Sequence, residues 1–358
     1  MGFLDSLLIT SDGTRLRCWS IRKNAMNTDL NDEPFRSRPG FMRIELVVAV
    51  ILCVLFLTLI SPGINDRRGP SRRTECLNNL KCLALAVNNY AANYNGAVPY
   101  LVDGTDGWPI VLLPYLDASE TAQALRDPKL RATAKNSSLK IFQCPRDKRD
   151  LGVKSRLSYV ANSGYGRFVI NSNSGAVSEI GAHPVFEPWP GMKSLYSNEP
   201  DRRNAHTRAI IRSTGVFWRA DNDGFQMTLD DIGRDDGVTN TLLFTENLNA
   251  GPWHSTKTMD LAFVIGLNSI RFDHGKTKAD YSPLRIQSID LKSFAINANQ
   301  GTLLGSSPAP SSVHSGQVMA AFCDGRAKAI SEKIDPAVYA RMMSSNGQRL
   351  GQRIDDNW

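Results

Sequence analysis

An uninterrupted apolar run near the N-terminus dominates the hydrophobic pattern of this chain. Residues 46–60 are fifteen consecutive residues without a charge, which corresponds to about 22 Å of helix. Apolar residues on both sides, from Phe41 to Ile64, extend the run toward the roughly 30 Å of a bilayer core. No small-x-small cleavage site follows, which disfavours an ordinary secretory signal. The pattern predicts a membrane-spanning helix over residues 41–64.

A second apolar pattern follows with helical spacing. Its positions recur three and four residues apart and so share one face of a helix; they are Leu77, Leu80, Ala84, Val87, Ala91 and Tyr94. Between the two patterns, Gly69-Pro70 removes a backbone donor, and we expect it to break what would otherwise be one rod. We therefore expect a linker and an amphipathic helix over residues 65–95.

After Gly96 the chain changes to short apolar runs separated by Gly, Pro, Asn and Asp, as in a β-rich domain. The clearest hairpin has a buried strand at 318–323, a turn at Asp324-Gly325 and a return strand at 326–329. The predicted fold class is therefore α+β. The hydrophobic helix continues, after the Gly-Pro break, into an amphipathic helix packed on a large antiparallel β-rich domain over residues 96–358.

One carboxylate stands at the start of the apolar run. A charge at the centre of a membrane helix costs about 2.5–3.5 kcal/mol, less near the interface, so Glu45 suggests a partner outside its own segment. Gly-Phe-x-x-x-Glu before a hydrophobic helix resembles the processing site of type IV prepilins and type II secretion pseudopilins. Glu45 is the fifth residue after Gly40, and Pro62 is the twenty-second.

The resemblance implies a processing event and a set of partners. A prepilin peptidase would remove residues 1–40 as a leader, cutting between Gly40 and Phe41, and would methylate the new amino group of Phe41. In an assembly of pilin-like subunits, that ammonium group would neutralise Glu45 of a neighbour. The expected location is the inner membrane, crossed once, with the C-terminal domain in the periplasm. Arginines after the run favour the opposite orientation, and we give the processing site precedence.

Further motifs extend the resemblance along the chain. They are Cys-Leu-Asn-Asn-Leu-Lys at 76–81, Leu-Leu-Pro-Tyr-Leu at 112–116, Cys-Pro at 144, Ser-Tyr-Val-Ala-Asn at 158–162, Asp-Gly-Val-Thr-Asn-Thr-Leu at 236–242, and His314 followed after nine residues by Asp324-Gly325. As an ordered set they resemble the pseudopilin-like bacterial family known as domain-of-unknown-function family 1559. The family implies an anchored pilin-like helix with a β-rich periplasmic domain, and it brings no established biochemical activity.

His314 and Asp324 of the last motif are the first candidates for chemistry. An extended strand between them spans about 23 Å, so we expect that they share neither a metal nor a proton. Asp324 most simply opens the Asp-Gly turn through its side-chain oxygen. For His314 we favour a hydrogen-bonded packing histidine, with a loop ligand or a surface-recognition residue as the alternative.

An acidic loop offers a second candidate. Asp221 and Asp223 have part of the oxygen-ligand spacing of a calcium loop, although turn-forming aspartates are the default interpretation. We expect no other cofactor.

The cysteines leave several arrangements open. In the predicted topology Cys76, Cys82, Cys144 and Cys323 lie on the oxidising side of the membrane. Cys76 and Cys82 point to divergent faces of one helix and cannot bond each other. Cross-links from this helix to Cys144 and Cys323, a single Cys144–Cys323 bridge, and free buried thiols all remain compatible with the sequence.

Two function classes find no support. The chain has no Gly-x-Ser-x-Gly, no His-Glu-x-x-His and no phosphate-binding glycine loop, so no local enzyme signature is present. The net charge of +7 comes from dispersed basic residues without a recognition motif, and we expect no nucleic-acid partner. The leading hypothesis is a non-enzymatic pseudopilin-like envelope protein. The alternatives are a permanently anchored binding module for a glycan, metal or protein, and an anchored hydrolase.

Overall fold

The computed structural model describes residues 43–60, 68–149, 151–166, 168–170, 177–179, 209, 211–220, 224–266, 270–273, 285–289, 295–298, 300 and 303–347. The chain divides into two units, Met1–Ser61 and Pro62–Trp358, and each is described by itself. The predicted processing residues Gly40 and Phe41 and the calcium candidates Asp221 and Asp223 lie outside the described residues.

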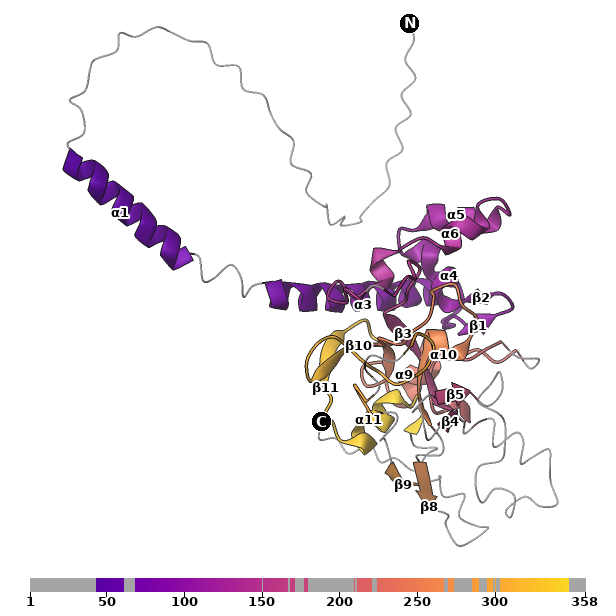
Figure 1. The fold of residues 1–358 in the computed structure, drawn as a ribbon. Coiled ribbons are helices and arrows are strands. Elements are labelled where there is room, and N and C mark those ends of the chain that lie inside the picture. Colours follow the sequence, from indigo (N-terminus) through magenta and orange to yellow (C-terminus); the bar gives the residue numbers. More distant parts are fainter. Residues whose placement is uncertain are drawn as a thin grey trace, which may run out of the picture. The chain divides into compact units, whose positions relative to one another are not determined.

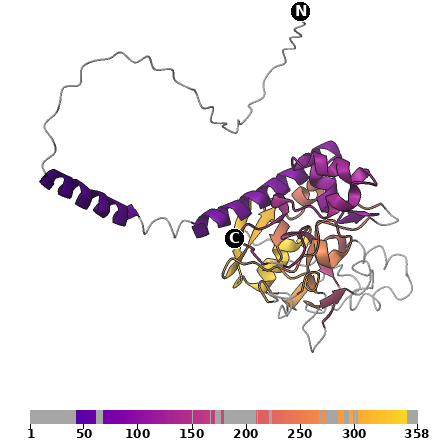
Figure 2. The same cartoon turned by 45° about the horizontal axis from the view of Figure 1, so that its top comes forward.

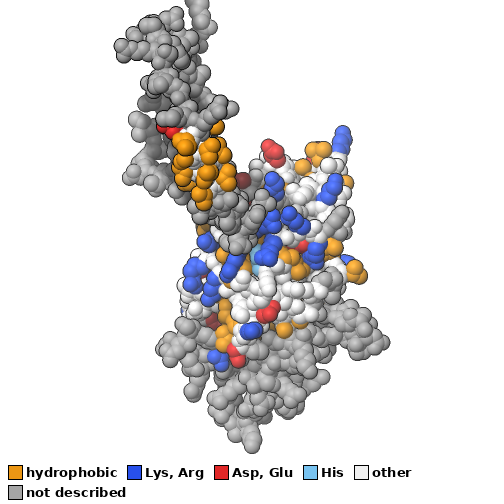
Figure 3. Space-filling model, turned by 60° about the vertical axis from the view of Figure 1, so that its left-hand side comes forward, with side chains coloured by type: hydrophobic (Ala, Val, Ile, Leu, Met, Phe, Trp, Pro, Cys, Tyr) orange, Lys and Arg blue, Asp and Glu red, His pale blue; other side chains and the backbone are white. Residues whose placement is uncertain are grey.

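The described part of the first unit is helix α1, Arg43–Ile60 (Figure 1). Its sequence contains neither Gly nor Pro, and Glu45 lies in its first turn. Its side chains are described over residues 44–56, and every large apolar side chain there is more than half exposed (Figure 3). Within the described residues, no helix combines the length and the apolarity that crossing a membrane requires.

The second unit begins with a long helix, α3, at Arg68–Asn93. The expected break does not fall at Gly69-Pro70 itself, because both residues lie in the first turn of α3, and residues 61–67 before this helix lie outside the described residues. A helix has no internal acceptor for the N–H groups of its first turn, so proline is tolerated there. Leu80, Ala84, Val87 and Ala91 of the predicted stripe are buried. Tyr94 is 52% exposed and follows the last residue of the helix, so its place in the stripe was wrong.

A five-stranded sheet forms the centre of the second unit. Its strands, in spatial order, are β11 (Ala327–Ser331), β10 (Gln317–Phe322), β6 (Leu242–Glu246), β3 (Tyr159–Gly166) and β7 (Ala262–Gly266). The expectation of a purely antiparallel domain is wrong at one edge, where β3 and β7 pair in parallel. The chain leaves β6 on one side of β3 and returns on the other side as β7, so residues 247–261 form a long crossover rather than a hairpin.

Helix α3 packs against β10, β11 and β6 (Figures 1 and 2). All five residues of β6 are buried, which means that both faces of the sheet are covered at its centre. Helix α11, Pro336–Met343, is a second neighbour of β6. It is fixed to β3 by the Tyr165 hydroxyl, which donates to the Ala340 carbonyl at 2.9 Å. This contact joins α11 to the C-terminal end of β3, whereas Glu246 of β6 pairs with Tyr159 at the start of that strand.

Smaller elements surround this centre. They are β1 (Val102–Asp103), β2 (Asp106–Gly107), α4 (Trp108–Leu112), η1 (Leu113–Tyr115), α5 (Ser119–Arg126), α6 (Arg131–Lys135), η2 (Lys140–Phe142), β4 (Phe168–Ile170), β5 (Val177–Glu179), α9 (Leu229–Arg234), α10 (Thr258–Leu261), β8 (Ile270–Asp273) and β9 (Arg285–Ile289). Three antiparallel pairs, β1–β2, β4–β5 and β8–β9, stand apart from the main sheet. The predicted α+β class is confirmed.

The predicted C-terminal hairpin is confirmed as β10 and β11, which pair antiparallel. The turn between them contains Gly325 at φ +88°, a backbone conformation that glycine adopts without strain. The Asp324 carboxylate accepts the backbone N–H of Arg326 at 2.9 Å. Asp324 thus has the turn-opening contact that the sequence predicts.

Candidate functional site

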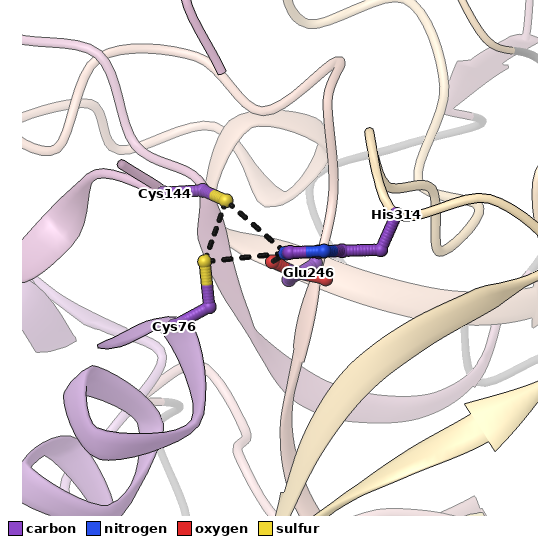
Figure 4. Close-up of side chains that lie close together, drawn as sticks. All are labelled: Cys76, Cys144, Glu246 and His314. Carbon is purple, nitrogen blue, oxygen red and sulfur yellow. Dashed lines mark hydrogen bonds and ion pairs between the residues drawn. The ribbon is translucent and has the colours of Figure 1, made fainter. Parts of the chain in front are cut away.

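Four buried side chains that are remote in the sequence meet beside the start of β10: Cys76, Cys144, Glu246 and His314. Cys76 comes from α3, Cys144 from the loop after η2, Glu246 from the end of β6, and His314 from the loop before β10. Figure 4 shows the four side chains pointing toward one another. We call this group the Cys-His-Glu cluster.

One nitrogen of the histidine faces all three other side chains. His314 Nε2 lies 3.3 Å from Cys76 Sγ, 3.6 Å from Cys144 Sγ and 3.5 Å from Glu246 Oε1. The two sulfurs are 2.7 Å apart. Each of the four residues is 3% exposed or less. The cluster is consequently a closed, water-poor site with three kinds of donor atom converging on one point.

Glu246 is held in place through only one of its two carboxylate oxygens. Oε2 accepts the Ser312 hydroxyl at 2.6 Å and the Met319 backbone N–H at 2.9 Å. Oε1 is buried, has no hydrogen-bond partner, and faces His314 Nε2. Because a buried carboxylate oxygen without a partner is costly, this orientation marks Oε1 as available to a further group.

The loop that carries Cys144 is fixed by a buried acid. Asp147 accepts the Arg149 Nε–H at 2.9 Å, and Arg156 Nη1 lies 3.3 Å from its second oxygen. Arg149 also donates to the Leu248 carbonyl at 2.7 Å, just after β6. These charge-assisted contacts tie the Cys144 loop to the strand end that carries Glu246.

The loop that carries His314 is fixed by backbone contacts. The His314 N–H donates to the Ser312 hydroxyl at 3.1 Å, and the Gln317 N–H donates to the His314 carbonyl at 3.3 Å. Ser312 therefore orients both Glu246 and the histidine loop, so that the two cannot shift independently.

The pKa values of the two thiols are shifted in opposite directions. A hydrogen bond from Cys144, aided by His314, lowers the pKa of Cys76 to about 5 in spite of burial. The same hydrogen bond, together with burial, raises the pKa of Cys144 far above its usual range. Burial raises the pKa of Glu246 to about 7, with His314 acting against it. The pair therefore gives up its first proton readily and keeps the second.

The geometry does not fit nucleophilic catalysis. In a cysteine–histidine–acid triad one ring nitrogen faces the nucleophile, while the other donates to the acid that orients the ring. Here Nε2 faces both the sulfurs and the acid, and Nδ1 lies 3.5 Å from the Arg146 guanidinium. The Cys76 sulfur is also fully buried, with no face open to a substrate. Two thiols, an imidazole and a carboxylate can instead hold a metal ion, and the two thiols alone could form a disulfide.

Among the sequence-predicted site residues that the structure describes, only His314 belongs to this cluster. His314 is buried as favoured, but two cysteines and an acid are its neighbours. Asp324 belongs to the hairpin turn rather than to the cluster, and Glu45 lies exposed on α1. Sequence reasoning missed Glu246 altogether, because a lone glutamate at the end of an apolar strand gives no local signal.

The structure narrows the cysteine pairings that the sequence left open. Cys76 lies beside Cys144, whereas Cys323 is buried elsewhere as a free thiol and Cys82 is exposed. Among the described cysteines none is joined in a disulfide. The quoted motifs contained Cys76, Cys144 and His314 without showing that they meet, because the sequence separations, such as 68 residues between the cysteines, hide the contact.

Comparison with known families identifies the second unit. Residues 67–337 match the model of the family described as protein of unknown function DUF1559, also called SBP_bac_10. The match covers about three quarters of the chain, since 271 of 358 residues are included. No curated protein and no solved structure is similar enough to add a further relative. The chain belongs to this family, which the motif set of the sequence predicted.

Proposed function

We propose that this DUF1559 protein is a non-enzymatic, pseudopilin-like envelope protein that is anchored in the inner membrane by α1. It is matured by a prepilin peptidase and is available as a subunit of a type II secretion or type IV pilus-like assembly. The second unit then projects into the periplasm. The proposal combines the family membership of the second unit with the processing motif that precedes α1.

The exposure of α1 is the observation that carries this proposal. Its large apolar side chains from Ile44 to Phe56 are more than half exposed, and Figure 3 shows them gathered on one face of α1. Because residues 46–56 are uncharged throughout, the other faces are apolar as well. A helix that is apolar all round is stable in lipid or inside a larger assembly, because water would otherwise meet its whole surface. Within the first unit, no described residue outside α1 covers this surface.

Glu45 gives the anchor its specificity. Its carboxylate lies in the first turn of α1, where the positive end of the helix dipole already favours an anion. The ammonium group of Phe41 from a neighbouring subunit is the counter-charge that processing would create. An ion pair of this kind sets the axial register between two otherwise featureless apolar helices.

Helix α3 supports the same role. One face is buried against the sheet, and the opposite face presents Leu85, 54% exposed, to the outside. A rigid domain built on a long helix is the form in which a pilin-like subunit connects its anchor to its projecting part.

Mass spectrometry of the mature N-terminus tests the processing step. The expected result is a chain that begins with methylated Phe41 and lacks residues 1–40. A mature chain that keeps these residues, or that has lost α1 as well, would contradict the proposal.

Replacing Glu45 tests assembly and separates the proposal from its main rival. Glu45→Gln and Glu45→Ala should both abolish amine-reactive cross-linking between subunits in the membrane. The control is Cys53→Ala, at another exposed position on the same helix, which should leave cross-linking unchanged. A permanently anchored binding module would be indifferent to all three changes. Equal cross-linking in the Glu45 variants and the wild type would therefore favour that rival.

A further inference from the structure

We propose that the Cys-His-Glu cluster is a structural zinc site in which Cys76, Cys144, His314 and Glu246 are the four ligands. This inference does not rest on the proposed function, since it concerns only side chains inside the second unit. It assigns a metal ion to the four side chains drawn in Figure 4. Their donor atoms are buried and lie within 4.8 Å of one another.

The donor set matches the coordination chemistry of zinc. Structural zinc sites use four tetrahedral ligands drawn mainly from cysteine thiolate and histidine nitrogen, and carboxylate oxygen is also accepted. Soft sulfur ligands disfavour calcium and magnesium, which bind oxygen. A site closed by four protein ligands and shielded from solvent is structural rather than catalytic, because no position is left for water.

The three distances from His314 Nε2 match as well. Zinc bonds of about 2.3 Å to sulfur and about 2.0–2.1 Å to nitrogen and oxygen place tetrahedral ligand atoms about 3.3–3.8 Å apart. The nitrogen–sulfur distances of 3.3 and 3.6 Å and the nitrogen–oxygen distance of 3.5 Å lie in this range. The sulfur–sulfur distance of 2.7 Å must widen by about 1 Å. It is also longer than the roughly 2.05 Å of a disulfide.

Glu246 distinguishes this site from a simple pair of cysteines. Its Oε2 is fixed by Ser312 and Met319, which leaves the buried Oε1 without a hydrogen-bond partner and directed at the cluster. A disulfide between Cys76 and Cys144 would leave this oxygen facing only His314 Nε2 at 3.5 Å, whereas a cation would bind it directly. The hydrogen bonds that Glu246 Oε2 accepts from Ser312 and Met319 also resemble the outer-shell hydrogen bonds that orient metal ligands in proteins.

Charge and the histidine tautomer set two conditions on binding. Two thiolates and a carboxylate carry three negative charges, which a divalent cation reduces to one, and the nearby Arg146 guanidinium offsets the remainder. Zinc bound to His314 Nε2 places the ring proton on Nδ1. Nδ1 would then be a donor, as is the Arg146 guanidinium that faces it in this structure. The Arg146 side chain is exposed, so its guanidinium can move out of hydrogen-bond range of Nδ1 while its charge stays beside the site.

The consequence for the fold is a cross-link. The four ligands join α3 to the sheet and to two loops, so bound zinc would stabilise the second unit by mass action. The metal would fasten the long helix at its N-terminal half, where Cys76 is buried.

The first experiment measures metal and thiols on one sample. The full chain is isolated in detergent under anaerobic conditions without added metal or chelator. We expect one zinc per chain by elemental mass spectrometry, and every cysteine alkylated after denaturation with chelator. A peptide in which Cys76 and Cys144 are joined by a disulfide would overturn the proposal, as would a reduced chain that takes up no zinc when zinc alone is added.

The second experiment compares variants in a zinc competition titration with a chromophoric chelator. Glu246→Gln keeps an acceptor for Ser312 and Met319 and should fold, but it should weaken zinc binding at least about tenfold. Cys144→Ser should weaken it further. Cys82→Ser, an exposed cysteine on the same helix, should bind like the wild type. Should Glu246→Gln, with an unchanged circular dichroism spectrum, bind zinc as tightly as the wild type, the four-ligand site is wrong.

Discussion

The two long helices, α1 and α3, use their apolar residues in different ways. On α1 the large apolar side chains are more than half exposed wherever they are described. On α3 most of the large apolar residues lie on one face, and Leu80, Leu83 and Val87 of that face are fully buried in the second unit. Both helices are long, but α3 is covered by the sheet of its own unit, whereas α1 is the whole of the described part of the first unit.

The contrast shows how the spread of apolar residues around a helix indicates where its partner lies. A single apolar stripe can be covered by one sheet, as β10, β11 and β6 cover α3. An apolar surface on all sides needs an apolar surrounding, such as lipid or other subunits. Changes on α3 should therefore affect the stability of the folded unit, and changes on α1 should affect only association.

The largest effect is expected on the buried face of α3. Leu80→Ala removes a side chain that is fully buried, and it should lower the free energy of unfolding by about 2–5 kcal/mol. Leu85→Ala, on the exposed face of the same helix, should change it by no more than about 0.5 kcal/mol. Urea denaturation followed by tryptophan fluorescence measures both. Similar losses in the two variants would mean that α3 is not packed on one side.

A smaller effect is expected in the loop that carries Cys144 and Asp147. Asp147→Asn leaves Arg156 without its buried counter-charge and should cost about 2–3 kcal/mol near neutral pH. This is less than for a fully buried pair, because the Arg149 side chain is 26% exposed.

The pH dependence of this effect has a definite sign. Burial raises the pKa of Asp147, but the bonds from Arg149 and the charge of Arg156 outweigh it and hold the pKa below its ordinary value. The stabilisation is therefore complete above the pKa of the unfolded carboxyl, about 3.9, and is lost as the pH falls through the lower folded value. The difference between wild type and Asp147→Asn should shrink in acid, and a difference that grows there would refute the ion-pair account.

The smallest effect is expected on α1. Val50→Ala should leave the unfolding free energy of the second unit unchanged within about 0.5 kcal/mol, because the Val50 side chain is more than half exposed. Urea denaturation followed by tryptophan fluorescence again measures the unfolding free energy. A loss comparable with that of Leu80→Ala would show that α1 contributes to the fold of the second unit, and the contrast between the two helices would disappear.

Local features of the fold could be predicted because their causes are local. The spacing of Leu80, Ala84 and Val87 repeats at the helical period, and Asp324-Gly325 supplies the backbone conformation and the side-chain acceptor that the β10–β11 turn uses. Pro70 was misread because proline breaks a helix in its interior but is tolerated in its first turn, and the sequence does not fix where that turn falls.

The sequence by itself determined the α+β class, the two apolar helical segments, the C-terminal hairpin and the family. Only the tertiary structure decided the parallel pairing of β3 with β7 and the meeting of Cys76 with His314, which are 238 residues apart. The physical reason is that helix period and turn chemistry act between near neighbours along the chain. Strand order and the contacts between cysteines depend instead on which distant segments the packed core brings together. Such long-range contacts cannot be predicted from a short sequence pattern.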